Sequence, residues 1–310
     1  MQDKFVTSVV EGFAVWGIGG AILLFMVLAG ETYMRWREGQ SPWSREGLNN
    51  LLFFAAFGTF IEAVLFNAAL LAAFFLVYDL TPLRVAVTWW TLPLYFVAGE
   101  FGFYWFHRLT HEIRLFWADH SIHHSAQTFD FTVNLRTAPF QTVFRLLIWS
   151  PFIALGFHPL VFILFAINGP AWQTFCHTTR IGRFAPWFEW LFMTPANHAV
   201  HHASNPIYLD KNYGGVLAIW DHVFGTYQRL EDDVKPVFGI TRQLETSNPI
   251  KVLIHEFVPL ILDFRAAPTF RAKMGVLFGK PGQTFERGKL GKEAAGRVES
   301  SGPVEQGAVR

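Results

Sequence analysis

Residues 107–125 read HRLTHEIRLFWADHSIHHS, and here an apolar chain abruptly becomes rich in histidine. This stretch holds five of the twelve histidines in 310 residues. Directly before it lies the apolar run RVAVTWWTLPLYFVAGEFGFYWF, residues 84–106. A bilayer crossing takes about 20 apolar residues, so this run predicts a membrane helix. The histidines therefore begin where that helix leaves the lipid.

The composition of the whole chain fits a membrane protein. Hydrophobic residues make up 52% and charged residues only 16%, whereas about 25% charged residues is usual in soluble domains. The formal net charge of +1 gives no reason to expect a nucleic-acid partner. Because Cys176 is the only cysteine, a metal bound within one chain would be held by nitrogen and oxygen.

Further apolar runs predict further spans. Residues 9–30 lack a basic segment before the run and are interpreted as a retained membrane helix rather than a leader peptide. Residues 51–78 and 84–106 predict a helical hairpin, because only a short Asp- and Pro-containing turn separates them. Residues 139–176 are too long for one crossing, and the GFHP break at 156–159 predicts a second hairpin.

The side of the membrane follows from the arginines. Arg35, Arg37 and Arg45 lie between the first two predicted spans, which indicates a cytoplasmic loop. Two crossings later the chain returns to that side at His107, and the second hairpin returns it again before His177. We therefore expect an all-α, multi-pass membrane protein with a helical cap on the cytoplasmic face of a bacterial inner membrane or the endoplasmic reticulum.

The domain organisation is expected to be simple. Residues 1–265 are interpreted as a single membrane-embedded domain. Residues 266–310 are rich in Gly, Ser and charge and predict a disordered tail. Within the domain, residues 250–264 are apolar enough for an interfacial helix.

Eight histidines fall into three groups. Members of each group are spaced i, i+4 or i, i+3, i+4, which places them on one face of a helix, and imidazole nitrogen suits iron, zinc, copper or nickel. Eight imidazoles exceed the capacity of one ion, so the pattern predicts two metals with open positions, which favours iron and oxygen chemistry. The groups are His107 and His111; His120, His123 and His124; and His198, His201 and His202.

The remaining histidines need separate interpretations. His177 follows the second predicted hairpin on the same side and is predicted to be a ninth ligand. His222 is a weaker candidate. His158 and His255 stand alone in apolar surroundings and are interpreted as hydrogen-bonded core residues.

The order HxxxH, HxxHH, HxxHH resembles the fatty acid hydroxylase/sterol desaturase superfamily of integral-membrane di-iron enzymes. The stretches CHTTRIG, residues 176–182, and TPANHAVHHASNPIYLDKNYGG, residues 194–215, resemble its alkylglycerol monooxygenase-like branch. The closing stretch, residues 210–227, fits the superfamily as well. The resemblance covers roughly residues 95–245.

The resemblance implies that the nine histidines bind two iron ions, which activate dioxygen to hydroxylate a lipid C–H bond. Purified protein could carry zinc instead, because zinc binds such sites more tightly than ferrous iron. The reductant would be a reduced pterin, as in the alkylglycerol branch, or a separate NAD(P)H-linked electron-transfer protein. Expected partners are the lipid substrate, membrane lipids and this electron donor. A desaturase with the same di-iron core stays open.

A non-enzymatic metal transporter or sensor is a third interpretation. Transporters place their ligands near the bilayer midplane, whereas these histidines follow the predicted spans, which disfavours it.

Carboxylates are expected around the metals. Two ferrous ions held by neutral imidazoles would bring about four positive charges into the protein, and burying uncompensated charge is costly. Acids that orient the imidazole N–H groups would reduce this cost. We expect Glu112 and Asp210 to have this supporting catalytic role. Further candidates, including amides that could hold a metal-bound water, are Asp119, Asp130, Asp221, Asn197, Asn205 and Asn212.

Overall fold

The computed structural model describes residues 2–41, 44–56 and 67–282. Within these residues every regular element is a helix, and β-pairing is limited to two isolated bridges, Phe192–Leu217 and Ala203–Phe238. The predicted all-α class is therefore confirmed for the described part of the chain.

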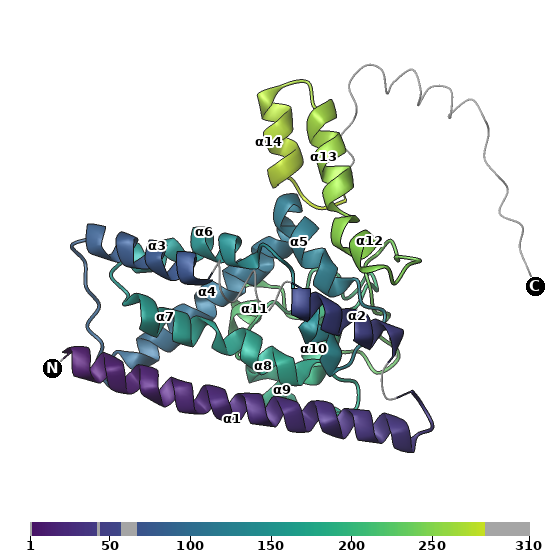
Figure 1. Cartoon of the computed structure of the whole chain (residues 1–310), viewed down its shortest axis with the longest axis horizontal. Helices are drawn as coiled ribbons and strands as arrows, with labels where there is room; N and C mark the ends of the chain where they lie inside the picture. The colour runs from purple at the N-terminus through teal and green to yellow at the C-terminus, as the bar shows by residue number, and fades with distance from the viewer. Residues whose placement is uncertain (1, 42–43, 57–66, 283–310) are drawn as a thin grey trace, which may run out of the picture.

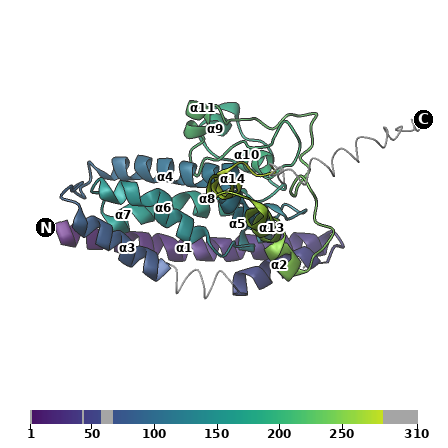
Figure 2. The ribbon, with the colours of Figure 1, turned by 90° about the horizontal axis from the view of Figure 1, so that it is seen from above.

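Long helices lie side by side along the molecule, and short helices gather at one end (Figures 1 and 2). The long layer consists of α1, α3, α4, α6 and α7, with α8 continuing α7 toward the other end. The helices are α1 (Gln2–Arg37), α2 (Arg45–Phe53), α3 (Asn67–Leu80), α4 (Leu92–Glu112), α5 (Arg114–His124), η2 (Phe131–Leu135), α6 (Gln141–Ala154), α7 (Pro159–Ala166), α8 (Asn168–Cys176), α9 (Pro186–Leu191), α10 (Pro195–His201), α11 (Ile219–Phe224), α12 (Pro249–Ile254), α13 (Phe257–Ala266) and α14 (Phe270–Phe278).

The predicted hairpin of 51–78 with 84–106 is wrong in its packing. Helix α3 packs mainly against α6 and α7, whereas α4 packs against α7, α5 and α6. Helix α4 also begins at Leu92 rather than near residue 84, with Pro93 in its first turn. The connection 81–91 is irregular, because it packs against the turn between α6 and α7.

That contact explains the left-handed glycine of the turn. The backbone N–H of Val85 donates to the Gly156 carbonyl at 2.8 Å. Gly156 has φ +95°, and a Cβ there would lie 2.6 Å from the carbonyl carbon of Leu83. Only glycine combines this conformation with so close an approach.

The break predicted inside 139–176 is confirmed. Helix α6 ends at Ala154 and α7 begins with Pro159 in its first turn. Among the described residues, one helical segment, Pro159–Cys176, is long and apolar enough to cross a membrane. Residues 57–66 of the predicted span 51–78 lie outside the described residues. The multi-pass topology therefore stays a prediction.

The main apolar core lies among the long helices. It joins Phe74 of α3, Tyr95 of α4, Trp149 of α6 and Phe162 of α7, all of them buried. The Trp149 indole N–H donates to the carbonyl of Gly102 at 3.1 Å, which ties α6 to α4. This core holds the N-terminal half of α4, and a second cluster that contains Phe103 and Phe106 holds the half from which the first histidines project.

Helix α14 lies inside the segment 266–310 that was predicted to be a disordered tail, with the Thr269 side chain accepting from the Ala272 N–H at its start. Val276 of α14 is buried together with Leu260 of α13 and Ala118 of α5. These apolar contacts order a segment whose composition predicted a tail. Residues 283–310 lie outside the described residues.

Candidate metal centre

Four separate elements bring nine histidines together at one end of the long helices. Helix α4 supplies its last turn, α5 its C-terminal half and α10 most of its length, while His177 is the residue that ends α8. Eight of the nine are buried and His123 is half-buried. The gathered residues are those predicted from the sequence: His107, His111, His120, His123, His124, His177, His198, His201 and His202.

Five of the histidines form one group, the five-histidine cluster. One nitrogen from each member lies within 4.8 Å of the corresponding nitrogen of every other member. The closest pair is His120 and His124, whose Nε2 atoms are 3.2 Å apart. The members are His107, His111, His120, His124 and His201.

The other four form the four-histidine cluster. Ligand atoms of His123, His177 and His202 all lie within 4.8 Å of one another, and His198 joins this group through His177. The Nε2 atom of His177 lies 3.2 Å from that of His123, 3.2 Å from that of His202 and 3.1 Å from that of His198. Two nitrogens bound to one ion at about 2.1 Å would be separated by about 3.0–3.4 Å, for angles between 90° and tetrahedral. The observed spacing is therefore that of ligands that share an ion. His124 stacks on His202 with ring centroids 4.3 Å apart, so the two clusters adjoin.

Backbone carbonyls orient three of the imidazoles through the ring nitrogen that faces away from the clusters. Nδ1 of His107 lies 3.0 Å from the Tyr213 carbonyl, that of His201 2.9 Å from the Lys211 carbonyl, and that of His177 2.7 Å from the Gln173 carbonyl. A carbonyl can only accept, so Nδ1 carries the proton and the Nε2 lone pair faces the cluster.

Some buried imidazole nitrogens of the clusters have no hydrogen-bond partner among the residues that the structure describes. This holds for Nε2 of His111 and Nε2 of His201, both buried. Buried polar atoms are rarely left unsatisfied, and each such case needs an explanation. A metal ion would supply the missing partner, so the donor set fits metal ions.

The protonation state suits metal binding. Burial lowers the pKa of all nine histidines, and the neighbouring imidazoles lower it further for most. Burial takes the pKa of His123 to about 3 and that of His201 to about 4. All nine rings are therefore neutral at pH 7, as ligation requires.

The loop 210–214 carries the two carbonyls that hold His201 and His107. Asp210 and Asn212 adopt left-handed conformations there, each with φ 57°. The buried carboxylate of Asp221 accepts from the N–H groups of Tyr213 and Gly214 at 2.8 and 2.7 Å. It also accepts from the Thr226 hydroxyl at 2.6 Å. Asp221 thus holds the loop in place and does not contact an imidazole; burial raises its pKa to about 6.

The two acids predicted to support catalysis lie differently. Asp210 is mostly exposed, and its Oδ1 lies 3.9 Å from Nδ1 of His111. The Glu112 carboxylate accepts from Arg108 at 2.8 Å. Arg108 in turn donates to the Tyr104 hydroxyl at 3.1 Å, which lies 3.0 Å from that of Thr226. Glu112 is therefore linked to the Asp221 network rather than directly to a histidine.

The other polar candidates have structural partners. Asp119 accepts from the Phe140 N–H, and Asp130 accepts from the Thr132 N–H at the start of η2. The side-chain amides of Asn197, Asn205 and Asn212 donate to backbone carbonyls.

The remaining histidines lie outside both clusters. A His222 ring nitrogen lies 3.0 Å from the Trp190 carbonyl, and one of His255 lies 2.6 Å from the Val252 carbonyl. The ring of His158 lies against those of Phe75 and Tyr78.

A cavity of about 260 Å³ opens beside the histidines, between α4, η2, α6 and α8. Members of both clusters line it, namely His107 and His120 of the five-histidine cluster and His123 and His177 of the other. Its other walls combine apolar and polar side chains: Phe103, Phe106, Ala138, Pro170, Ala171, Asn134, Arg136, Thr137, Gln141, Arg145, Gln173 and Thr174. Phe103 and Phe106 belong to the Phe- and Trp-rich run 89–106, whose aromatic residues are expected to line a substrate groove beneath the metals. The sequence did not point to the other lining residues, because helical periodicity gives no signal for which neighbouring elements enclose a cavity.

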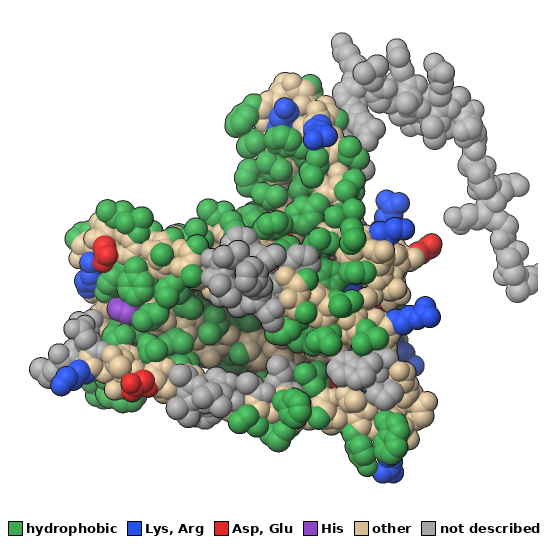
Figure 3. All heavy atoms as spheres, in the orientation of Figure 1, with side chains coloured by type: hydrophobic (Ala, Val, Ile, Leu, Met, Phe, Trp, Pro, Cys, Tyr) green, Lys and Arg blue, Asp and Glu red, His purple; other side chains and the backbone are tan. Residues whose placement is uncertain are grey.

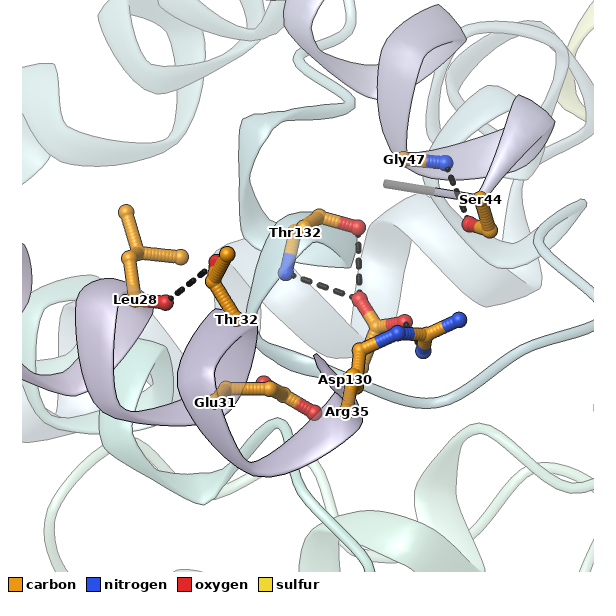
Figure 4. A pocket seen from close by; sticks show the side chains of 8 residues that line it. All are labelled: Leu28, Glu31, Thr32, Arg35, Ser44, Gly47, Asp130 and Thr132. Carbon is orange, nitrogen blue, oxygen red and sulfur yellow. Dashed lines mark hydrogen bonds and ion pairs between the residues drawn. The ribbon is translucent and has the colours of Figure 1, made fainter. Parts of the chain in front are cut away.

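A small polar pocket on the other side of η2 ties this wall to α1 (Figure 4). Asp130 accepts from the Thr132 N–H at 3.0 Å and lies 3.6 Å from the Arg35 guanidinium. Asn50 of α2 donates to the Thr132 hydroxyl. The arginine-bearing end of α1 and the histidines therefore lie at the same end of the helix layer, as the sequence predicted.

Comparison with known proteins found a matching family model and several similar proteins. Residues 92–226 match the fatty acid hydroxylase family model. The chain is similar to alkylglycerol monooxygenase of Xenopus tropicalis, with 33% identity over 276 residues, which covers 87% of the chain and 60% of that relative. It is similar to the Homo sapiens alkylglycerol monooxygenase, with 37% identity over 65% of the chain and 44% of that relative. Ornithine lipid hydroxylase OlsE of Rhizobium tropici is 31% identical over 47% of the chain and 44% of its own length.

The chain spans between 44% and 60% of the length of these three relatives. No solved structure matches it.

Proposed function

Because residues 92–226 match the fatty acid hydroxylase family model, we propose that the chain is a member of this family and a membrane-bound, non-haem di-iron oxygenase. It would hydroxylate a C–H bond of a lipid with dioxygen and an external reductant. The observation that carries the proposal is the pair of adjoining histidine clusters beside one cavity. The proposed catalytic unit is the membrane-embedded domain formed by residues 1–282, with the clusters on the cytoplasmic face.

The clusters supply nitrogen ligands for two ions. The five-histidine cluster would hold one ion, and the four-histidine cluster, with His177 at its centre, would hold the other. Iron ions bound there would activate dioxygen for attack on an aliphatic C–H bond. The chain's own contribution is to keep the imidazoles neutral and to aim them through the Tyr213, Lys211 and Gln173 carbonyls.

The two acids act in this proposal as positioning residues. Asp210 orients His111 from the solvent side. Glu112 acts through Arg108 and the Tyr104 and Thr226 hydroxyls, which reach the Asp221 carboxylate. That carboxylate fixes the backbone of Tyr213, whose carbonyl holds His107.

The cavity would hold the part of the lipid that reacts. Phe103, Phe106 and Ala171 offer apolar contacts to an alkyl chain, whereas Gln141 and Asn134 offer hydrogen bonds to a polar group nearby. A lipid with both parts, such as a glyceryl ether or an aminolipid, fits this lining. The names of the relatives point to the same two classes. The electron donor would be a reduced pterin or an NAD(P)H-linked protein.

The proposal is tested by expressing the full chain in membranes with iron, a lipid extract and ¹⁸O-labelled dioxygen, and by analysing the lipids by mass spectrometry. We expect one labelled oxygen atom in a lipid product. The variant His120→Ala removes a member of the five-histidine cluster and should abolish the product. The matched variant His222→Ala changes a histidine outside both clusters and should leave the product unchanged.

Two outcomes would contradict the proposal. Loss of two hydrogens without a labelled oxygen would identify a desaturase on the same metal centre. Metal uptake without oxygen consumption, with any of the reductants supplied, would instead favour a transporter or a sensor.

A further inference from the structure

Helix α13 is apolar on both of its sides. Phe257, Leu260 and Phe264 point toward α5 and α14 and belong to a buried apolar cluster. Away from that side, Val258 and Leu262 are about half exposed, at 44% and 52%. A helix at a water interface normally carries polar residues on its outer side, and one that is apolar all round is surrounded by apolar material. We therefore expect the outer side of α13 to contact an apolar partner.

The exposed apolar surface continues onto α12 and α14. We call it the hairpin surface, and Figure 3 shows it as hydrophobic side chains along the projecting α13–α14 hairpin. Monomeric soluble proteins rarely expose a continuous apolar area of this kind. Its members are Ile250, Ile254, Val258, Ile261, Leu262, Phe270 and Phe278.

The free end of the hairpin is basic. Arg265, Arg271 and Lys273 flank the connection between α13 and α14, where Figure 3 shows basic side chains. The nearest acid, Asp263, is paired with Arg114 of α5 at 2.6 Å. Basic side chains beside an apolar helical face are the combination that binds the surface of anionic membranes.

The direction of the hairpin agrees with such a partner. It projects from α5 roughly across the long helices (Figure 1). If those helices cross the bilayer, as the proposed function requires, the hairpin runs along the membrane plane. Its base contacts α5, the helix that carries His120, His123 and His124.

From these observations we propose that the α13–α14 hairpin lies in the interface of a bilayer that contains anionic lipids. The hairpin surface contacts acyl chains, and the three basic residues contact lipid phosphates. This inference rests on the membrane placement in the proposed function. It adds a second attachment to the bilayer, which holds α5 and its histidines at a fixed depth.

A fluorescent probe can locate the hairpin surface. Cys176 is the only native cysteine and is buried, so a cysteine introduced at the surface can be labelled selectively. We would label Leu262→Cys with an environment-sensitive dye and place the full chain in vesicles of phosphatidylcholine and phosphatidylglycerol. We expect a blue-shifted emission and loss of most of the fluorescence to a quencher attached to lipid acyl chains. The matched control is Lys235→Cys, at an exposed position far from the hairpin in sequence, which should stay unquenched by the lipid.

A double variant tests whether the basic residues of the hairpin contact anionic lipids. Arg265→Glu combined with Arg271→Glu should weaken the quenching of the Leu262→Cys label in these vesicles, and much less in vesicles of phosphatidylcholine alone. Equal quenching in all cases would remove the anionic lipid from the proposal.

Two results would overturn the membrane contact. The first is quenching of the Leu262→Cys label by aqueous iodide and not by the lipid quencher. The second is cross-linking of two copies of the variant through this position. The second result would show that another copy of the chain covers the surface. Lipid oxidation measured on the same samples separates this test from that of the proposed function, because the position of the label does not depend on turnover.

Discussion

His177 would complete the proposed metal site in the four-histidine cluster. Its Nε2 lies within 3.2 Å of three other imidazole nitrogens, which come from two other helices: His123 from α5 and His198 and His202 from α10. Removing it would take away the ligand on which the four-histidine cluster is centred. The five-histidine cluster does not include His177 and would keep all its members.

We therefore expect His177→Ala to retain about one of two metal ions per chain, measured by elemental analysis of purified protein. His222→Ala should retain both. Full occupancy in His177→Ala would show that the ring is not a ligand, and loss of both ions would show that the two clusters are not independent.

The acids beside the histidines should differ in their effects. Residues that orient a ligand typically change metal affinity by about 10–100-fold when they are replaced. Asp210 is mostly exposed and 3.9 Å from His111, so Asp210→Asn should lower the affinity by about tenfold or less. Asparagine tolerates the left-handed conformation of this position, which keeps the loop intact. Metal titration checks the value, and a loss much larger than tenfold would make Asp210 a ligand.

Glu112 provides a contrasting case. Glu112→Gln can still accept from Arg108 and should bind metal normally, whereas Glu112→Leu breaks the link toward Asp221. We expect the leucine variant alone to lose metal affinity and turnover. Equal losses in both variants would indicate that the negative charge itself is required.

At the scale of elements, the loop 210–214 matters because it holds histidines from two different helices. Its backbone carbonyls accept from His201 of α10 and His107 of α4. The Asp221 carboxylate keeps that backbone in place through two N–H groups and one hydroxyl. The stability of the loop and the aim of the two imidazoles are therefore coupled.

The pH dependence of Asp221 follows from its burial. Its pKa is raised from 3.8 to about 6 in the folded chain, so between these values the folded state binds more protons than the unfolded state. The contribution of Asp221 to the free energy of unfolding thus falls as pH rises through this window and is constant above it. Relative to Asp221→Asn, the natural chain should gain about 2 kcal/mol of stability between pH 7 and pH 4. Denaturant unfolding of both chains in detergent measures the difference, and a difference independent of pH would contradict the shift.

Elements were predictable where the chemistry is local. The spacing of the histidines, the break before Pro159 and the helical class all follow from short-range patterns. The packing of α3 against α6 and α7 was not predictable, because the sequence of an apolar helix does not show which neighbouring helix it will contact. Helix α14 was missed for a related reason: its ordering comes from Ala118 and Leu260, which lie elsewhere in the chain.

At the scale of the whole molecule, the gathering of three distant histidine groups was predictable from the side of the membrane to which each predicted span returns. Apart from its aromatic residues on α4, the cavity between α4, η2, α6 and α8 was not predictable, because its walls depend on how these elements pack. The positioning role of the closing stretch was likewise hidden, since main-chain carbonyls of Lys211 and Tyr213 perform it. Every residue has a backbone carbonyl, so the sequence does not show which carbonyls accept hydrogen bonds from the histidines.

Under the proposed function, the junction of α8 with His177 would link the metal centre to the lipid. The apolar segment Pro159–Cys176 ends one residue before that ring. A span adjusts its tilt to the thickness of the hydrocarbon layer, and any such adjustment would pull on the imidazole attached to its end. We expect turnover in vesicles to pass through an optimum as acyl chains are lengthened, with metal content unchanged. Lipid oxidation would then be fastest in bilayers whose hydrocarbon thickness matches the length of the segment Pro159–Cys176.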